Sequence, residues 1–338
     1  MPVVLGAAGG VSRSSVMPNQ SLGEEGDRYA YDRPGNSVSA QEVIMNILKM
    51  PVAVMAALLA ACGGSDSSPR TGQVSVQVTD APVDAAESVV VRFTGISFKP
   101  ADEAPVEVVF LTPKDIDLLA LAGGDAAPLV SNLSVPAGAY EWMRLHVDAE
   151  FDTVYDSYIR IDGSQHELRV PSGSESGLKL NGGFVVPQGG VASYTLDFDL
   201  RKSVVEPVGQ PGYFLKPVIR MVNTAQVGML TGVVDTALVA SACTGGETGA
   251  VYLYAGADVV PDDVDGASPD PLASGALTLQ GDGTYRYTIA FLSPGSYTAA
   301  WTCDAAQDVP ESSEDLVFTP GVNVSISTGV TTVQDFAP

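Results

Sequence analysis

The stretch Val74-Ser75-Val76-Gln77-Val78-Thr79 decides the fold class, because apolar and polar side chains alternate along it. Successive side chains of a β-strand point to opposite faces, so this alternation predicts a strand with one buried face. Asp80-Ala81-Pro82 predicts the end of that strand, since proline has no N–H for a β-ladder and aspartate favours turns. We therefore expect a sheet that packs against a second layer.

Short apolar runs of the same kind recur along the chain, and turn residues separate them. Hydrophobic residues make up 45% of the sequence, and 35 glycines and 23 prolines supply turns. Two turn motifs, Asp282-Gly283 and Ser293-Pro294-Gly295, predict hairpins in the C-terminal third. The pattern predicts an all-β chain of two antiparallel β-sandwich domains, Ig-like or prealbumin-like, over residues 71–225 and 226–338.

Upstream of these strands, Leu58-Leu59-Ala60-Ala61-Cys62 resembles the lipobox of bacterial lipoproteins. The resemblance implies that residues 45–61 are a lipoprotein signal peptide, that Cys62 carries lipid, and that residues 62–70 are a flexible tether. The membrane is then one partner of the protein. Gly63 stands where aspartate commonly signals retention in the inner membrane, so the resemblance points to the outer membrane of a Gram-negative bacterium.

Residues 1–44 are polar, rich in Gly, Ser and Asn, and lack a hydrophobic period. Met45 begins a better signal peptide, with Lys49 in a short basic segment before the apolar run. Two interpretations stay open: synthesis begins at Met45 and the first 44 residues are a mis-annotated start, or they form a disordered extension.

The chain is strongly acidic, with a net charge of −23. Residues 226–338 contain 14 acidic residues and a single basic one, Arg286. Nucleic-acid partners are excluded by this balance, because phosphate binding needs clustered Lys and Arg. The charge serves either solubility and mutual repulsion or the binding of divalent cations.

A set of segments gives residues 71–225 a specific resemblance. These segments are Thr79-Asp80-Ala81-Pro82-Val83-Asp84, Gly138-Ala139-Tyr140, Gly177-Leu178-Lys179-Leu180, Asp197-Phe198-Asp199-Leu200-Arg201-Lys202 and Tyr213-Phe214-Leu215-Lys216-Pro217. In this order they resemble the bacterial domain of unknown function 4382, a lipoprotein-borne family, and the resemblance implies no catalytic residue. Residues 226–338 are similar to prealbumin-like or carboxypeptidase-regulatory-like sandwich modules.

The two cysteines downstream of Cys62 are Cys243 and Cys303. An exported protein sits in an oxidising compartment, so we expect these two residues to form a disulfide. The alternative is a pair of free buried thiols.

Polar residues in the first domain form a candidate ligand site that consists of Asp80, Lys179, Asp197, Asp199 and Lys216. Asp197 and Asp199 alternate with apolar neighbours, so both carboxylates lie on one face of a strand. The alternative is a charge ladder in which Lys202, Lys216 and Arg220 pair with those carboxylates across strands. Paired carboxylates also permit acid–base chemistry on a sugar, provided that a cleft separates them and one pKa is raised.

Calcium is the one cofactor that the sequence allows. A candidate calcium loop contains Asp258, Asp262, Asp263 and Asp265, whose hard oxygens suit that ion, although the spacing is not that of an EF-hand. A solvated acidic loop is the alternative. The two histidines, His146 and His166, lack partners at zinc-ligand spacing, and no confident metal site, nucleophile elbow or phosphate loop is present.

These observations predict a lipid-anchored protein of the cell envelope with a non-catalytic binding or structural role and a glycan or a partner protein as ligand. Two alternatives remain: a carbohydrate-active or other hydrolytic enzyme that uses paired carboxylates, and a calcium-dependent adhesion module. A cleft in which carboxylates converge would favour the enzyme, whereas carboxylates paired to Lys and Arg would favour the binding protein.

Overall fold

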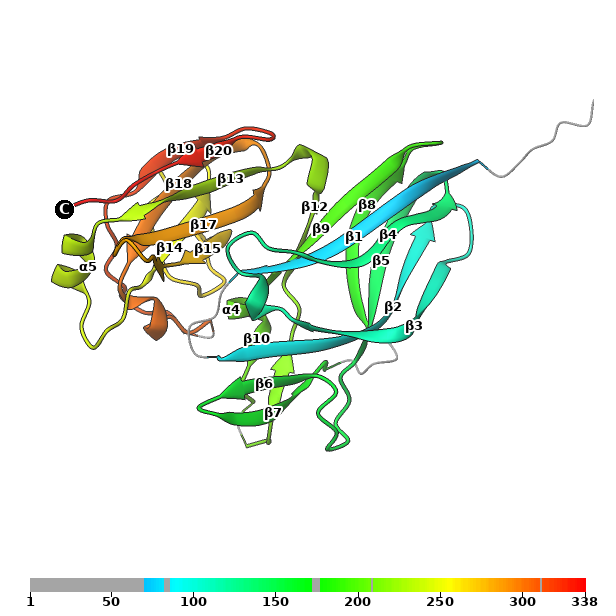
Figure 1. The fold of residues 1–338 in the computed structure, drawn as a ribbon, viewed down its shortest axis with the longest axis horizontal. Coiled ribbons are helices and arrows are strands. Elements are labelled where there is room, and N and C mark those ends of the chain that lie inside the picture. Colours follow the sequence, from blue (N-terminus) through cyan, green and yellow to red (C-terminus); the bar gives the residue numbers. More distant parts are fainter. Residues whose placement is uncertain (1–69, 82–85, 172–176, 208, 311) are drawn as a thin grey trace, which may run out of the picture. The chain divides into compact units, whose positions relative to one another are not determined.

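A computed structural model describes residues 70–338 except 82–85, 172–176, 208 and 311. Figure 1 shows these residues as a ribbon. The predictions for residues 1–44, for the signal peptide at 45–61, for Cys62 and for the tether up to residue 69 lie outside the described residues. Within the described part of the chain, no helix is both long and apolar enough to cross a membrane.

Twelve strands, β1–β12, build the first pair of sheets (Figure 1). Their bounds are β1 Thr71–Ala81, β2 Ser88–Pro100, β3 Val106–Asp117, β4 Ala127–Pro136, β5 Gly138–Asp148, β6 Tyr158–Ile161, β7 Ser164–Arg169, β8 Leu178–Val186, β9 Val191–Asp199, β10 Val204–Val205, β11 Tyr213–Leu215 and β12 Ile219–Asn223. One sheet has the order β12-β9-β1-β4. The other has the order β10-β11-β7-β6-β2-β5-β8, and β3 also pairs with β2.

Short helical turns connect some of these strands. They are η2 (Leu119–Leu121), α4 (Leu200–Ser203) and η3 (Thr224–Gln226). Of these, α4 is the one that matters for the site, because it follows β9 directly and carries charged side chains.

The core of the first pair of sheets confirms the alternation seen in the sequence. Val74, Val76 and Val78 of β1 are buried, as are Leu196 and Phe198 of β9. The rings of Phe93 and Phe198 meet edge to face across the two sheets, with centroids 6.4 Å apart. Apolar side chains from alternate positions therefore fill the space between the layers.

Strand β1 lies between β4 and β9, and it pairs with β4 antiparallel but with β9 parallel. Two further parallel pairs, β11 with β7 and β13 with β20, occur in the structure. The predicted β-sandwich class is confirmed, and the sheets combine mostly antiparallel pairs with these three parallel ones. The parallel pairs join strands that are far apart in sequence, and such pairs need a long crossover connection.

Eight strands, β13–β20, build the second pair of sheets. Their bounds are β13 Gly228–Val234, β14 Ala250–Ala255, β15 Ala273–Ala276, β16 Thr278–Leu279, β17 Tyr285–Leu292, β18 Gly295–Thr302, β19 Val322–Ile326 and β20 Thr331–Val333, with helices α5 (Thr236–Ala242) and η4 (Asp304–Gln307). The sheet orders are β16-β17-β13-β20 and β15-β14-β18-β19. Leu230, Leu253, Tyr287 and Trp301 are buried between them. The exact boundary near residue 225 stays a prediction.

The two turn motifs have different outcomes. Asp282-Gly283 joins β16 to β17, which pair antiparallel, and Gly283 adopts a φ of +84°. Ser293-Pro294, in contrast, connects β17 to β18, and these strands belong to different sheets. That hairpin prediction is wrong, since the turn carries the chain from one layer to the other.

The predicted disulfide is confirmed. Cys243, at the end of α5, is bonded to Cys303, which follows β18, and their Cα atoms lie 5.5 Å apart. The bond fastens the only α-helix of the described second pair of sheets to the end of a central strand.

Candidate functional site

The charged end of β9 forms the centre of the candidate site. Asp199 caps α4, because its carboxylate accepts a hydrogen bond from the Lys202 backbone N–H at 3.3 Å. The cap turns the chain sharply, so that Leu200 points into the core while Lys202 points toward the second pair of sheets. A four-residue helix thus places charges against a neighbouring layer.

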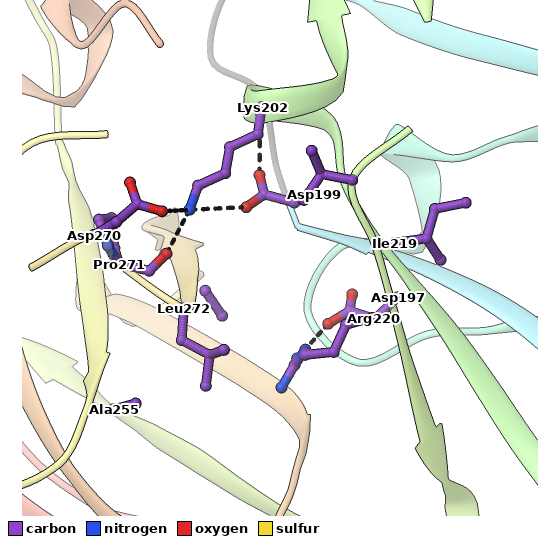
Figure 2. Close-up of a pocket in the computed structure, with 11 residues that line it drawn as sticks. Asp197, Asp199, Lys202, Ile219, Arg220, Ala255, Asp270, Pro271 and Leu272 are labelled. Atoms are coloured by element: carbon purple, nitrogen blue, oxygen red, sulfur yellow. Dashed lines mark hydrogen bonds and ion pairs between the residues drawn. The ribbon is translucent and has the colours of Figure 1, made fainter. Parts of the chain in front are cut away.

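Asp197 and Arg220 face each other on adjacent strands, β9 and β12, and form an ion pair (Figure 2). The Asp197 side chain is 13% exposed and the Arg220 side chain 21%. Burial raises the pKa of the Asp197 carboxyl above its ordinary value of 3.8, and Arg220 offsets part of that rise. The cross-strand partner expected from the sequence is therefore present.

Lys202 links the first pair of sheets to the loop before β15. Its ammonium group pairs with Asp270, donates a hydrogen bond to the Pro271 carbonyl at 2.6 Å, and lies 3.8 Å from the Asp199 carboxylate. Figure 2 shows Lys202 reaching between Asp199 and Asp270. We call Asp197, Asp199, Lys202, Arg220 and Asp270 the junction.

A cavity of about 360 Å³ is lined by the junction together with apolar residues of both pairs of sheets, among them Ile219 and Leu272 (Figure 2). Burial also raises the pKa of Asp199, and Lys202 opposes that rise. The sequence analysis predicts a ligand site on the face of β9 that carries Asp197 and Asp199. The second pair of sheets covers this face.

Three of the five predicted site residues come together at this place. Asp80, next to Phe198 in the register of β1 and β9, is buried and lines a small cavity of about 20 Å³ together with Asp197. Asp199 lines the cavity of the junction together with Asp197.

The two predicted lysines lie elsewhere. Lys179 of β8 stands opposite Arg144 of β5, and its ammonium lies 5.0 Å from the centroid of the Trp142 ring. Lys216 is exposed, and its backbone N–H donates to the Ser203 carbonyl at 2.7 Å. In the described contacts, Lys202 and Arg220 take the cationic role at the junction instead.

A buried charged group near the junction was missed by sequence reasoning. Arg201 of α4 donates hydrogen bonds to the Tyr252 hydroxyl at 2.8 Å and to the Ala305 carbonyl at 2.6 Å. The Tyr252 hydroxyl donates to Asp308, whose carboxylate lies 3.7 Å from the Arg201 guanidinium. The only signal in the sequence was the position of Arg201 beside the Asp197–Asp199 segment.

A second contact that the sequence did not indicate joins Ser97 of β2 to His146 of β5, with 2.5 Å between Oγ and Nε2. Burial lowers the pKa of His146. Ser97 is only 2% exposed, so its hydroxyl has no access to a substrate. The pair satisfies polar groups within the sheet and does not form a nucleophile.

The four residues of the predicted calcium loop point in different directions. Asp258 accepts a hydrogen bond from the Asn323 side chain at 2.7 Å, Asp262 accepts one from the Asp263 backbone N–H at 3.1 Å, and Asp265 accepts one from the Ala267 N–H at 2.7 Å. Asp263 turns inward and groups with Asp308 and Glu314. Only one residue of the predicted loop thus enters the carboxylate group found among the described residues.

The fold defines an all-β protein with two successive β-sandwich regions. Residues 71–217 match the model of a family described as Domain of unknown function (DUF4382), the domain that the sequence motifs resemble. The comparison with curated proteins found no match.

Solved structures with a distant likeness include bacterial pilus components. The minor pilin GBS52 of Streptococcus agalactiae is 10% identical, with 78% of this chain and 94% of that chain covered and a TM-score of 0.17. The major pilin subunit BcpA of Bacillus cereus is 10% identical, with 79% and 99% covered and a TM-score of 0.18. The fimbrial anchor protein Mfa2 of Porphyromonas gingivalis is 12% identical, with 73% and 82% covered and a TM-score of 0.16. At these TM-scores the likenesses carry no inference about this chain.

Proposed function

We propose that the protein is a non-catalytic binding or structural component of the cell envelope. The observation that carries this proposal is the pairing of the junction carboxylates, since Asp197 is held by Arg220 and Asp199 shares Lys202 with Asp270. Acid–base catalysis needs a carboxyl group that can reach a substrate. Here the carboxylates neutralise neighbouring cations instead: the Asp197–Arg220 pair joins two strands of one sheet, and the Lys202–Asp270 pair joins the two pairs of sheets.

The Cys243–Cys303 disulfide supports a location outside the cytoplasm, because such bonds persist in oxidising compartments. Anchoring through lipid on Cys62, and retention in the outer membrane, extend this proposal. A Cys62→Ala variant is expected to lose palmitate labelling and to move from the membrane fraction to the soluble fraction. Unchanged labelling and fractionation of that variant would contradict the anchor.

A glycan is the ligand that the surface of the eight-stranded sheet supports best. Trp142 is half-buried on the face of β5 that points away from the core, and the charged groups of Arg144 and Lys179 each lie 5.0 Å from its ring centroid. An aromatic ring offers a stacking surface to a sugar, and two cations in an acidic protein attract an acidic one.

A glycan array probed with the purified chain tests this surface. The wild-type chain is expected to be retained on acidic glycans, and a Trp142→Ala variant is expected to lose retention. Trp301 is buried in the second pair of sheets and serves as a folding probe in both proteins. Absence of retention by the wild-type chain would favour a partner protein over a glycan.

Hydrolysis is the second candidate function, and one observation favours it. Asp197 and Asp199 line the same cavity of about 360 Å³, and burial raises the pKa of both. A hydrolase predicts release of reducing ends from an oligosaccharide panel and loss of that release in an Asp197→Asn variant. Intact oligosaccharides after prolonged incubation with the wild-type chain would remove this candidate.

A further inference from the structure

Three carboxylates from two separate segments of the second pair of sheets converge. Asp263 comes from the loop between β14 and β15, and Asp308 and Glu314 come from the segment between η4 and β19. One oxygen of each lies within 4.8 Å of the others. Asp263 is 1% exposed and Asp308 is 8% exposed, so water screens their mutual repulsion poorly.

The Asp263 carboxylate is incompletely satisfied. Its Oδ2 atom accepts a hydrogen bond from the Glu314 backbone N–H. Its Oδ1 atom is buried and has no hydrogen-bond partner among the described residues. A buried carboxylate oxygen without a donor is costly, and its place in the carboxylate group indicates a ligand with positive charge.

The charges of this group are unbalanced. Among the described contacts of Arg201, its guanidinium lies 3.7 Å from Asp308 and donates hydrogen bonds to the neutral oxygens of Tyr252 and Ala305. One guanidinium against three carboxylates leaves a formal charge of −2 when all are ionised. A divalent cation restores neutrality, which a further hydrogen bond does not.

We propose that Asp263, Asp308 and Glu314 bind a calcium ion. Calcium takes oxygen ligands at about 2.3–2.6 Å, so ligands on opposite sides of the ion lie up to about 5 Å apart, which matches the span of the group. The donor set is all carboxylate and lacks the imidazole and thiolate ligands that zinc prefers. Magnesium demands a tighter octahedral shell and dehydrates reluctantly.

The calcium site is continuous with the buried contacts of Arg201. Asp308 accepts the Tyr252 hydroxyl and the Val264 backbone N–H, the latter at 3.1 Å, so an ion bound to Asp308 fixes the end of the chain of contacts that begins at α4. Calcium is therefore expected to stabilise both the loop that holds Asp263 and the packing of α4 on β14.

Isothermal titration of the full, EDTA-treated chain with calcium chloride at constant ionic strength tests the site. Binding is expected in the range of about 10⁻⁴–10⁻³ M that is common for extracellular modules, and saturating calcium should raise the melting temperature by about 3 °C or more. Magnesium chloride at the same concentration should have a smaller effect.

Two variants locate the ion. Asp263→Asn is expected to abolish the heat of binding and the thermal shift while the calcium-free protein melts at or above the wild-type temperature, because a repulsive buried charge is removed. Asp265→Asn removes an equal charge from the same loop outside the group and should bind calcium like the wild type. Should Asp263→Asn fail to fold, Glu314→Gln gives the same comparison. The proposal is overturned if the wild-type chain shows neither heat of binding nor a thermal shift at about 5 mM calcium. It is also overturned if Asp263→Asn responds to calcium as the wild type does.

Discussion

Arg201 of α4 donates a hydrogen bond to the hydroxyl of Tyr252 on β14, at 2.8 Å, and both side chains are buried. The first residue belongs to the first pair of sheets and the second to the other pair. A buried charged side chain therefore joins the two pairs of sheets, at a place where apolar contacts are more common. Removal of such a charge leaves its partners without compensation.

We expect Arg201→Met to lower the free energy of unfolding by about 3–5 kcal/mol, because Asp308 then keeps a buried negative charge without its cation. Urea denaturation followed by tryptophan fluorescence measures the change. Arg160→Met alters an exposed arginine on β6 and should change stability by less than about 0.5 kcal/mol. If both substitutions changed the free energy of unfolding equally, the contacts of Arg201 would not contribute to stability as predicted.

The pKa of Asp197 predicts how stability depends on pH. Burial raises this pKa above the unfolded value of 3.8, so the folded chain binds the proton more tightly than the unfolded chain. The contribution of Asp197 is therefore fully present below pH 3.8 and is lost as pH rises through the folded pKa. Relative to wild type, Asp197→Asn should gain stability as pH rises through this window, in urea unfolding experiments between pH 4 and 7.

Asp115 serves as a comparison, because its pKa is shifted in the opposite direction to that of Asp197. The Arg92 guanidinium lowers the pKa of this carboxyl, so its contribution is present above pH 3.8 and is lost as pH falls through the folded pKa. The side chain is 51% exposed, and solvent screening makes the effect small. If both Asn variants shifted the pH profile in the same direction, the assignment of Asp197 as a desolvated group would be wrong.

Loss of the disulfide is expected to cost about 4 kcal/mol, the loop-entropy value for a sequence separation of 60 residues. The double variant Cys243→Ser, Cys303→Ser and the reduced wild-type chain should unfold at similar urea concentrations. Reductant should leave the double variant unchanged, which separates loss of the bond from other effects of the reagent. A wild-type midpoint that is insensitive to reductant would contradict the expected cost.

Gly232 tests the close packing of the second pair of sheets. A Cβ at this position of β13 would lie 1.7 Å from the Gln334 carbonyl oxygen, so Gly232→Ala should destabilise the fold by about 3 kcal/mol or more. Gly281→Ala adds the same methyl group where no heavy atom lies within 4 Å, and should be nearly neutral. Thermal melting of both variants makes the comparison, and similar melting temperatures would refute the predicted clash.

Local patterns made much of the fold predictable. The alternation in β1 and around Phe198 placed the buried faces correctly, because side-chain direction in a strand depends only on position along it. Asp197 and Arg220 were expected as cross-strand partners, and they are adjacent in the register of β9 and β12. The cysteine pair followed from the compartment that the N-terminal sequence implied.

Long-range arrangement limited the remaining predictions. The parallel pairing of β1 with β9, and the sheet change at Ser293-Pro294, depend on which distant strands become neighbours, and periodicity does not encode that choice. Asp263 was placed in a loop site with Asp258, Asp262 and Asp265, whereas it meets Glu314, 51 residues away. The sequence analysis groups Lys179 and Lys216 with the carboxylates as polar residues of one domain, but the fold places these lysines on other surfaces.

The position of β1 between an antiparallel and a parallel neighbour has a mechanical consequence. Hydrogen bonds in a sheet run across the strands, so a force that pulls Thr71 along the axis of β1 loads the bonds to β4 and to β9 together, in shear. They cannot open one after another as they do when a hairpin is peeled apart. The strand that begins the described chain is thus built to resist extension, and the domain is expected to unfold at a higher force when pulled along β1 than when pulled across it.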